Sequence, residues 1–173
     1  MIQHHIDRLT VHHTARLLED NREAPEVLRA WRRAHGERGW HDVAYHYLID
    51  GEGHVYEARA VRYRGDTRTD YDTTGHFLVA CEGNFEEQQP TRAQLDSLVQ
   101  VLAWAAVEFD VEPDTIAGHR DYAATACPGE ALYAGIVDGS LQAAVAATVP
   151  KEVRLLPYGE GKALVAAIES GRA

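Results

Sequence analysis

Three segments of the 173-residue sequence carry side chains that could hold a metal ion. The first is the pair His12-His13, which ends a short apolar run and precedes Thr14. The second is His119, and the third is Cys127, eight residues later and followed by Pro-Gly. Two imidazoles and one thiolate suit Zn²⁺, and a catalytic zinc keeps three protein ligands so that water can take the fourth position. The sequence therefore favours an open, hydrolytic zinc site over a closed structural one.

Each of these residues also has a simpler interpretation. A histidine is more often a structural hydrogen-bonding residue than a ligand, and a Cys-Pro-Gly turn can merely end a loop. Cys81 lies within an apolar run and is interpreted as a buried core thiol. Strand alternation places His12 and His13 on opposite faces, but it does not say which face holds the site. The choice between the two neighbours stays open on these grounds.

The elements that must position these residues can be placed from hydrophobic periodicity and turn residues. We expect strands at 7–12, 42–50, 54–58 and 77–82, and helices at 24–35, 91–109 and 130–147. The turn Gly51–Gly53 joins the second and third strands into a hairpin, and Thr91 with Gln94 forms a capping box. Strands thus alternate with helices, which predicts an α/β fold with a mixed central β-sheet flanked by helices.

Two regions fall outside this pattern. The polar segment 62–75 is expected to be an exposed loop. Pro150 marks a boundary, so we expect one domain over residues 1–150 and a C-terminal tail over 151–173. A helical stretch near Lys162–Ile168 should pack this tail on the domain.

Charge and hydropathy exclude several classes of function. The formal net charge of −10 argues against nucleic acid or an anionic membrane as a partner, because both attract Lys and Arg. No stretch approaches the roughly 20 apolar residues that cross a bilayer. The first residues do not resemble a secretory signal, so we expect synthesis in the cytoplasm and action on a cell wall only after phage lysis or non-classical export. We also expect a monomer.

Four segments, in order, resemble the type 2 N-acetylmuramoyl-L-alanine amidase family, which includes phage amidase lysozymes and peptidoglycan recognition proteins. They are VHHTA (11–15), DVAYHYLIDGEGHVYEAR (42–59), EGNFEEQQPTRAQLDSL (82–98) and GHRDYAATACPG (118–129). The resemblance implies that Zn²⁺ is the cofactor and that His12, His119 and Cys127 are its ligands. It also implies that peptidoglycan or a muropeptide is the partner.

The resemblance assigns further roles around the metal. Tyr45 should lie near the zinc, where its hydroxyl could bond the developing oxyanion. Thr125, two residues before Cys127, should act there more weakly than the lysine that other members carry. His46 is expected to contact the substrate. The proton donor stays open between Tyr45, His46 and solvent.

The sequence departs from the family in two places. The segment 62–75 lacks the Gly-Ala-His or Trp-His element that helps to shape the substrate groove in many members, which leaves the choice of substrate open. Ala80 stands where other members have Glu or Ser.

These observations predict a zinc-dependent amidase, similar to an endolysin, that hydrolyses the amide between N-acetylmuramic acid and L-alanine. One alternative is a recognition module that binds peptidoglycan without cutting it. Such relatives commonly lose a zinc ligand, often the cysteine, whereas this sequence keeps all three. The other alternative is a cytoplasmic amidase that recycles soluble muropeptides. Members of that branch tend to use an aspartate as the third ligand.

Overall fold

The computed structural model describes residues 1–18, 24–39, 42–67, 69–148, 155–156 and 165–166. The helices are α1 (Ala24–Glu37), α2 (Arg92–Phe109), α3 (Glu130–Val137) and α4 (Ser140–Ala146), with two 3₁₀ turns, η1 (Pro113–Thr115) and η2 (His119–Asp121). The strands are β1 (Arg8–His13), β2 (Tyr47–Ile49), β3 (Val55–Glu57), β4 (His76–Cys81), β5 (Ala117–Gly118), β6 (Leu155–Leu156) and β7 (Val165–Ala166). They form one sheet in the order β5-β1-β4-β2-β3-β7-β6.

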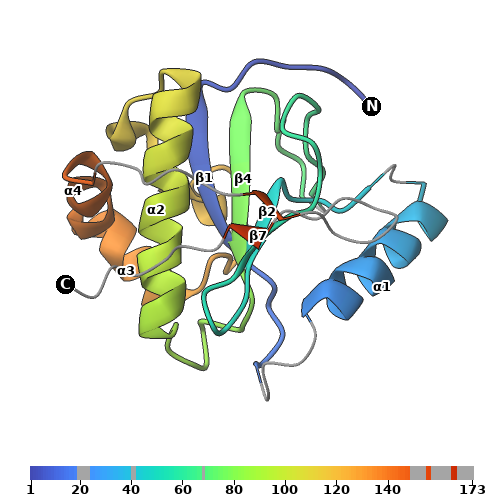
Figure 1. Ribbon diagram of the computed structural model, residues 1–173, viewed down its shortest axis with the longest axis horizontal. Helices are drawn as coiled ribbons and strands as arrows, with labels where there is room; N and C mark the ends of the chain where they lie inside the picture. The colour runs from blue at the N-terminus through green and yellow to red at the C-terminus, as the bar shows by residue number, and fades with distance from the viewer. Residues whose placement is uncertain (19–23, 40–41, 68, 149–154, 157–164, 167–173) are drawn as a thin grey trace.

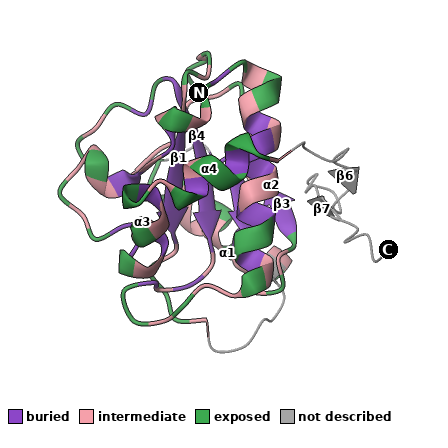
Figure 2. Cartoon of the chain, turned by 90° about the vertical axis from the view of Figure 1, so that its left-hand side faces the viewer, coloured by how far each residue is buried: buried purple, intermediate pink, exposed green. Residues whose placement is uncertain are grey.

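The sheet is mixed, as the sequence predicts. β1 pairs in parallel with β4 and β5, β2 pairs in parallel with β4, and β2 and β3 form the expected antiparallel hairpin. Helix α2 lies across β1 and β4, with α3 and α4 beside it, whereas α1 lies on the opposite side of the sheet (Figure 1). The strands are buried between helices whose outer surfaces are exposed (Figure 2).

The two faces of β1 lead to different environments. Leu9 and Val11 join the larger core, which α2, α3 and α4 cover. Thr10 and His12 point to the opposite face because successive strand residues alternate. There the smaller core gathers Leu28 of α1 with residues of β2, β3 and β4. The second face is therefore the side on which a polar site can form next to an apolar support.

Helix α2 begins where the capping signal predicts. Thr91 Oγ1 accepts a hydrogen bond from the backbone N–H of Gln94 at 3.0 Å, and Gln94 Oε1 accepts one from the N–H of Thr91 at 3.1 Å. The side chain of Gln94 is buried and also donates to the carbonyl of Glu82 at 2.7 Å. The cap thus fixes the helix start and ties it to the end of β4.

The expected strand at 42–50 is correct only for its last part. β2 covers Tyr47–Ile49, and residues 42–46 form bends. At the start of this segment a side chain satisfies the backbone carbonyls: the guanidinium of Arg59 donates to Val43 O at 2.7 Å and to Asp42 O at 3.2 Å. The next three carbonyls accept from backbone N–H groups of Asp66, Arg59 and Ala58. A buried guanidinium thus takes the place of a neighbouring strand at Asp42 and Val43, which strand periodicity does not reveal.

Two other expectations need comment. The loop 62–75 is not fully exposed, because Gly65 and Thr73 are buried and Thr73 Oγ1 donates to Gly65 O at 2.7 Å. In the tail, we expected a helix near Lys162–Ile168. This prediction is wrong for Val165–Ala166, which form β7 and pair with β3. Sheet pairing with an open edge overrides the local helical spacing at these positions. Most of the segment 151–173 lies outside the described residues.

Candidate metal centre

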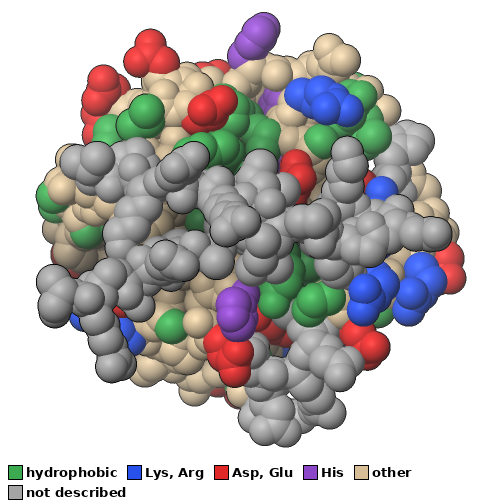
Figure 3. All heavy atoms as spheres, viewed as in Figure 1, with side chains coloured by type: hydrophobic (Ala, Val, Ile, Leu, Met, Phe, Trp, Pro, Cys, Tyr) green, Lys and Arg blue, Asp and Glu red, His purple; other side chains and the backbone are tan. Residues whose placement is uncertain are grey.

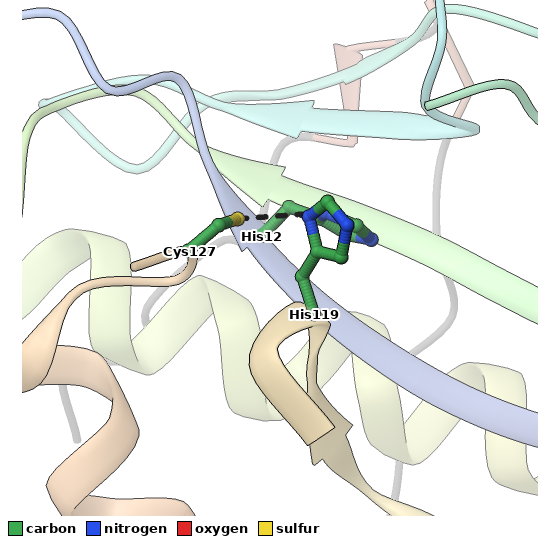
Figure 4. Close-up of side chains that lie close together, drawn as sticks. All are labelled: His12, His119 and Cys127. Carbon is green, nitrogen blue, oxygen red and sulfur yellow. Dashed lines mark hydrogen bonds between the residues drawn. The ribbon is translucent and has the colours of Figure 1, made fainter. Parts of the chain in front are cut away.

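Three side chains from separate elements converge on the second face of the sheet. His12 comes from the end of β1, His119 opens η2 directly after β5, and Cys127 closes the loop that follows. Among the described residues these three form the group whose ligand atoms all lie within 4.8 Å of one another. Figure 4 shows the two rings and the thiol pointing toward one another. The parallel pairing of β5 with β1 brings the carboxyl ends of both strands to the same place.

The separation between His12 and Cys127 suits a tetrahedral metal site. Nδ1 of His12 lies 3.6 Å from Sγ of Cys127. Ligand bonds of about 2.0–2.1 Å for nitrogen and about 2.3 Å for sulfur, at the tetrahedral angle, place two such atoms about 3.6 Å apart. The other nitrogen of His12, Nε2, is buried and has no hydrogen-bond partner among the described residues. Within the described part of the chain, His12 therefore has no hydrogen bond from either ring nitrogen to the backbone that would explain its burial, so both nitrogens face the group or its surroundings without a structural partner.

Burial controls the protonation of the group. It lowers the pKa of His12 well below its usual value, with the neighbouring His119 as the next cause, and it lowers the pKa of His119 to about 4. Both rings are thus neutral near pH 7 and have lone pairs to offer. Burial raises the pKa of the Cys127 thiol to about 12, against smaller opposing effects of the His13 N–H and Arg120. A cation at the centre would reverse this, because a coordinating thiol is deprotonated.

The structure decides between the two adjacent histidines. His12 reaches the group, whereas the ring of His13 turns to the other face, where Nδ1 accepts a hydrogen bond from the N–H of Phe85 at 3.3 Å. The backbone N–H of His13 donates to Cys127 Sγ at 3.4 Å. His13 therefore supports the sulfur through its backbone, while its neighbour supplies the imidazole.

Several contacts of Arg120 hold the loop 118–129 around the two candidate ligands that it carries. The backbone N–H of Arg120 donates to Cys127 O at 2.9 Å, and its guanidinium donates to Ala126 O, to Glu86 and to Glu130. The guanidinium also lies 4.6 Å from the centre of the Tyr133 ring. The sequence motif contains Arg120, but its spacing gives no sign of this role.

Tyr45 and Thr125, the two residues predicted to act beside the metal, both line the pocket next to the group. The ring of Tyr45 is 5.0 Å from the ring of His12, measured between centroids, and both Tyr45 and Thr125 line the same pocket as His119 and Cys127. The hydroxyl of Thr125 accepts a hydrogen bond from the N–H of Cys127 at 3.2 Å. Both hydroxyl-bearing side chains therefore border the pocket that adjoins the group.

His46 lies elsewhere. It is completely buried, its Nε2 bonds to Tyr63 O at 3.0 Å, and its Nδ1 accepts from the N–H of Leu78 at 2.9 Å. Both ring nitrogens are thus committed to the backbone. The geometry favours a structural role for His46 over the expected contact with substrate, and a lone histidine in a strand segment does not distinguish the two.

A pocket of about 540 Å³ opens beside the group. Its wall is formed by α1, the loop 62–75 and the loop 118–129. The lining residues are His13, Thr14, Ala15, Trp31, Ala34, His35, Arg38, Ala44, Tyr45, Thr67, Thr69, His119, Thr125, Ala126 and Cys127. On the face shown in Figure 3, acidic side chains lie at the upper left and also beside the basic side chains at the right, on the side where Figure 1 places α1.

The buried histidines predict a pH-dependent stability. Burial lowers the pKa of His46 to about 3 and those of His76 and His119 to about 4, against 6.5 in the unfolded chain. Below pH 6.5 the unfolded chain therefore binds more protons than the folded protein, so stability is full above that pH and is lost as the pH falls toward 4. Urea unfolding of the zinc-free protein should show a midpoint that decreases from pH 7.5 to pH 5. A constant midpoint over this range would contradict the burial of neutral rings.

The fold is a mixed β-sheet flanked by helices, and two histidines and a cysteine converge on it beside a pocket. Such a group could hold a metal ion through three ligands and leave a fourth position open. The sequence pattern of the N-acetylmuramoyl-L-alanine amidase family matches residues 3–130. The chain belongs to this family, which confirms the resemblance.

Named relatives fall into two groups. N-acetylmuramoyl-L-alanine amidase of Sus scrofa is 34% identical over 131 residues, which are 72% of this chain and 22% of that protein. Peptidoglycan-recognition protein SD of Drosophila simulans is 43% identical over 94 residues, 54% of this chain and 50% of that protein. The chain therefore spans about half of the recognition protein and about a fifth of the mammalian amidase.

Solved structures confirm the fold. The crystal structure of Drosophila peptidoglycan recognition protein SD has a TM-score of 0.68 at 31% identity, over 79% of this chain and 84% of that one. The amidase LysC of Clostridium intestinale has a TM-score of 0.68 at 24% identity, over 84% and 88%. Within the described residues, no helix is long and apolar enough to span a membrane.

Proposed function

We propose that this protein is a zinc-dependent amidase that hydrolyses the amide bond between N-acetylmuramic acid and L-alanine in peptidoglycan. The observation that carries the proposal is the convergence of His12, His119 and Cys127 beside a pocket of about 540 Å³. Three ligands leave one position of a tetrahedral ion open, which is the arrangement of catalytic rather than structural zinc.

The residues present fit a zinc ion. The two rings are neutral, the thiol is close to one of them, and the nitrogen–sulfur separation equals that of a tetrahedral pair. His12, His119 and Cys127 would hold the metal. When bound, zinc supplies a Lewis acid that polarises a carbonyl group and makes water nucleophilic near neutral pH.

The chain's own side chains would complete the site. Tyr45 presents a phenol beside His12, where it can donate a hydrogen bond to the carbonyl oxygen of the scissile amide as negative charge develops there. Thr125 can offer a second, neutral donor while its oxygen accepts from Cys127 N–H. Of the proton donors that the sequence left open, Tyr45 and solvent remain, because both nitrogens of His46 are already bonded.

A recognition module that binds peptidoglycan without cutting it is the main alternative, since several relatives are named recognition proteins. One related structure contains tracheal cytotoxin bound to the recognition proteins LCa and LCx. The complete ligand set argues for the enzyme. A binding module needs the pocket but has no use for an open metal position.

The experiment is metal removal. Purified protein should contain about one zinc per chain and release peptides with a free L-alanine amino terminus from isolated cell wall. Treatment with a chelator should abolish the release, and added zinc should restore it. If the zinc-free sample releases peptides at the original rate, the proposed mechanism is wrong, and if the loaded sample binds wall without cutting it, the recognition module is correct.

The same assay separates an endolysin-like enzyme from a recycling amidase. We propose the former, acting as a monomer on the cell wall after release from the cytoplasm. It should prefer insoluble sacculi, whereas a recycling enzyme would prefer soluble muropeptides. A higher rate on soluble fragments would therefore overturn the endolysin-like assignment without affecting the amidase itself.

A further inference from the structure

A short chain of hydroxyl groups connects the loop 62–75 to the metal centre. Oγ1 of Thr69 lies 2.7 Å from Nε2 of His119. Oγ1 of Thr67 lies 3.1 Å from Oγ1 of Thr69 and donates to the backbone carbonyl of Thr69 at 3.2 Å. Three hydrogen bonds thus run from the imidazole through two threonines to a carbonyl oxygen.

The carbonyl at the end of this chain fixes its direction. A carbonyl oxygen can only accept, so Thr67 gives its single hydroxyl proton to Thr69 O. Thr67 Oγ1 can then only accept from Thr69, whose own proton is thereby used. Thr69 Oγ1 in turn can only accept from His119, so Nε2 of His119 carries the proton. The remaining nitrogen, Nδ1, is left with a free lone pair.

We propose that Thr67 and Thr69 are positioning residues that select the Nε2-protonated tautomer of His119 and so keep Nδ1 available as a metal ligand. The inference rests on the proposed function, because it concerns the same three-ligand site. Metal-binding histidines commonly donate their second ring nitrogen to such an outer partner, and loss of that partner typically weakens metal binding by 10- to 100-fold.

The segment that carries these threonines is itself fixed. Asp66 pairs with the buried Arg59 at 2.6 Å on one side, and Thr73 bonds to Gly65 O on the other. Tyr71 packs on His119 with 5.1 Å between the ring centroids, and His12 lies 4.8 Å from the same ring. The ring of His119 therefore packs against two aromatic neighbours, while the chain of hydroxyl groups determines which of its nitrogens carries the proton. This segment is also where the sequence departs from the family's Gly-Ala-His element.

Two substitutions test the proposal through different links. Thr69→Val removes the acceptor and should weaken zinc binding, measured by competition with a chelator, by about 10- to 100-fold. Thr69→Ser keeps the hydroxyl and should restore the affinity. Thr67 does not bond to His119. Without the Thr67 hydroxyl, however, Thr69 can donate its own proton to Nε2 of His119, so Thr67→Val should also weaken zinc binding. Thr74→Val is the matched control, because Thr74 is exposed in the same loop and bonds to Asp72.

A second readout uses the zinc-free protein. Nitrogen-15 NMR of the histidine rings should show His119 protonated at Nε2 in the parent protein, and a shift toward the Nδ1-protonated form in Thr67→Val and Thr69→Val. The proposal is overturned if both valine variants bind zinc within about twofold of the parent, or if the tautomer does not change. Should Thr69→Val fail to fold, Thr67→Val alone decides.

These measurements also distinguish this inference from the proposed function. Neither uses the amidase assay. If the parent protein bound zinc but did not cut peptidoglycan, the proposed function would fail while the tautomer selection stood.

Discussion

Replacement of Cys127 by serine should lower zinc affinity and amidase activity by more than about 100-fold. Loss of a residue that only hydrogen-bonds a metal ligand already weakens metal binding by up to about 100-fold, and loss of a ligand itself should weaken it more. A thiolate is a soft, anionic ligand, whereas a serine hydroxyl stays protonated and neutral. Cys127 is also the single sulfur in the group, so the variant would retain only two imidazoles. The measurements are zinc content after gel filtration and peptide release from isolated wall.

Two matched variants make this result specific. Cys81→Ala removes the other free thiol, which is fully buried in β4 outside the group, and should keep one zinc per chain. Tyr45→Phe removes only a hydroxyl beside His12 and should keep the zinc while lowering the rate by about 100-fold, as loss of an oxyanion donor does. Equal activity of Cys127→Ser and the parent would eliminate the sulfur as a functional ligand.

The second large effect concerns stability. Arg59→Met should reduce the free energy of unfolding by about 3–5 kcal/mol, because it leaves several oxygens within the fold without their donor, at about 1–3 kcal/mol for each buried one. Arg59 is 2% exposed, and its guanidinium bonds to Asp66 and to the carbonyls of Asp42, Val43 and Arg64. Methionine can fill most of the volume but satisfies none of these oxygens. Urea unfolding should be followed in the presence of a chelator, so that metal binding does not contribute.

Arg92→Ala provides the control for a lost arginine. Its side chain is 86% exposed and pairs only with Asp96 among the described residues, one turn along α2. Such exposed pairs contribute roughly 0–1 kcal/mol, so the variant should unfold at nearly the same urea concentration as the parent. If Arg59→Met were equally mild, water would have to replace the guanidinium within the fold.

The loss of Arg59 should also disturb the site. This side chain joins the segment before β2, which carries Tyr45, to Asp66. Asp66 shortly precedes Thr69, whose hydroxyl bonds His119. The two wall segments of the pocket are therefore connected through one buried cation. A folded Arg59 variant should accordingly show weaker zinc binding as well as lower stability.

The sequence by itself determined the elements whose signals are local. The capping residues Thr91 and Gln94 set the start of α2, the apolar runs set β1 and β4, and the glycine turn set the β2–β3 hairpin. The resemblance of four ordered segments also identified the family and nominated His12, His119 and Cys127. These signals survive in the sequence because each depends on residues within a few positions of one another, or on motifs that retain their order.

Only the tertiary structure decided what depends on contacts between distant segments. The choice of His12 over His13 follows from the helices that cover one face of β1, and the structural role of His46 follows from bonds to Tyr63 and Leu78. The bond from Thr69 to His119 spans 50 positions of the chain. Hydroxyl and guanidinium groups bond wherever the fold brings an acceptor, so their partners leave no periodic trace in the sequence.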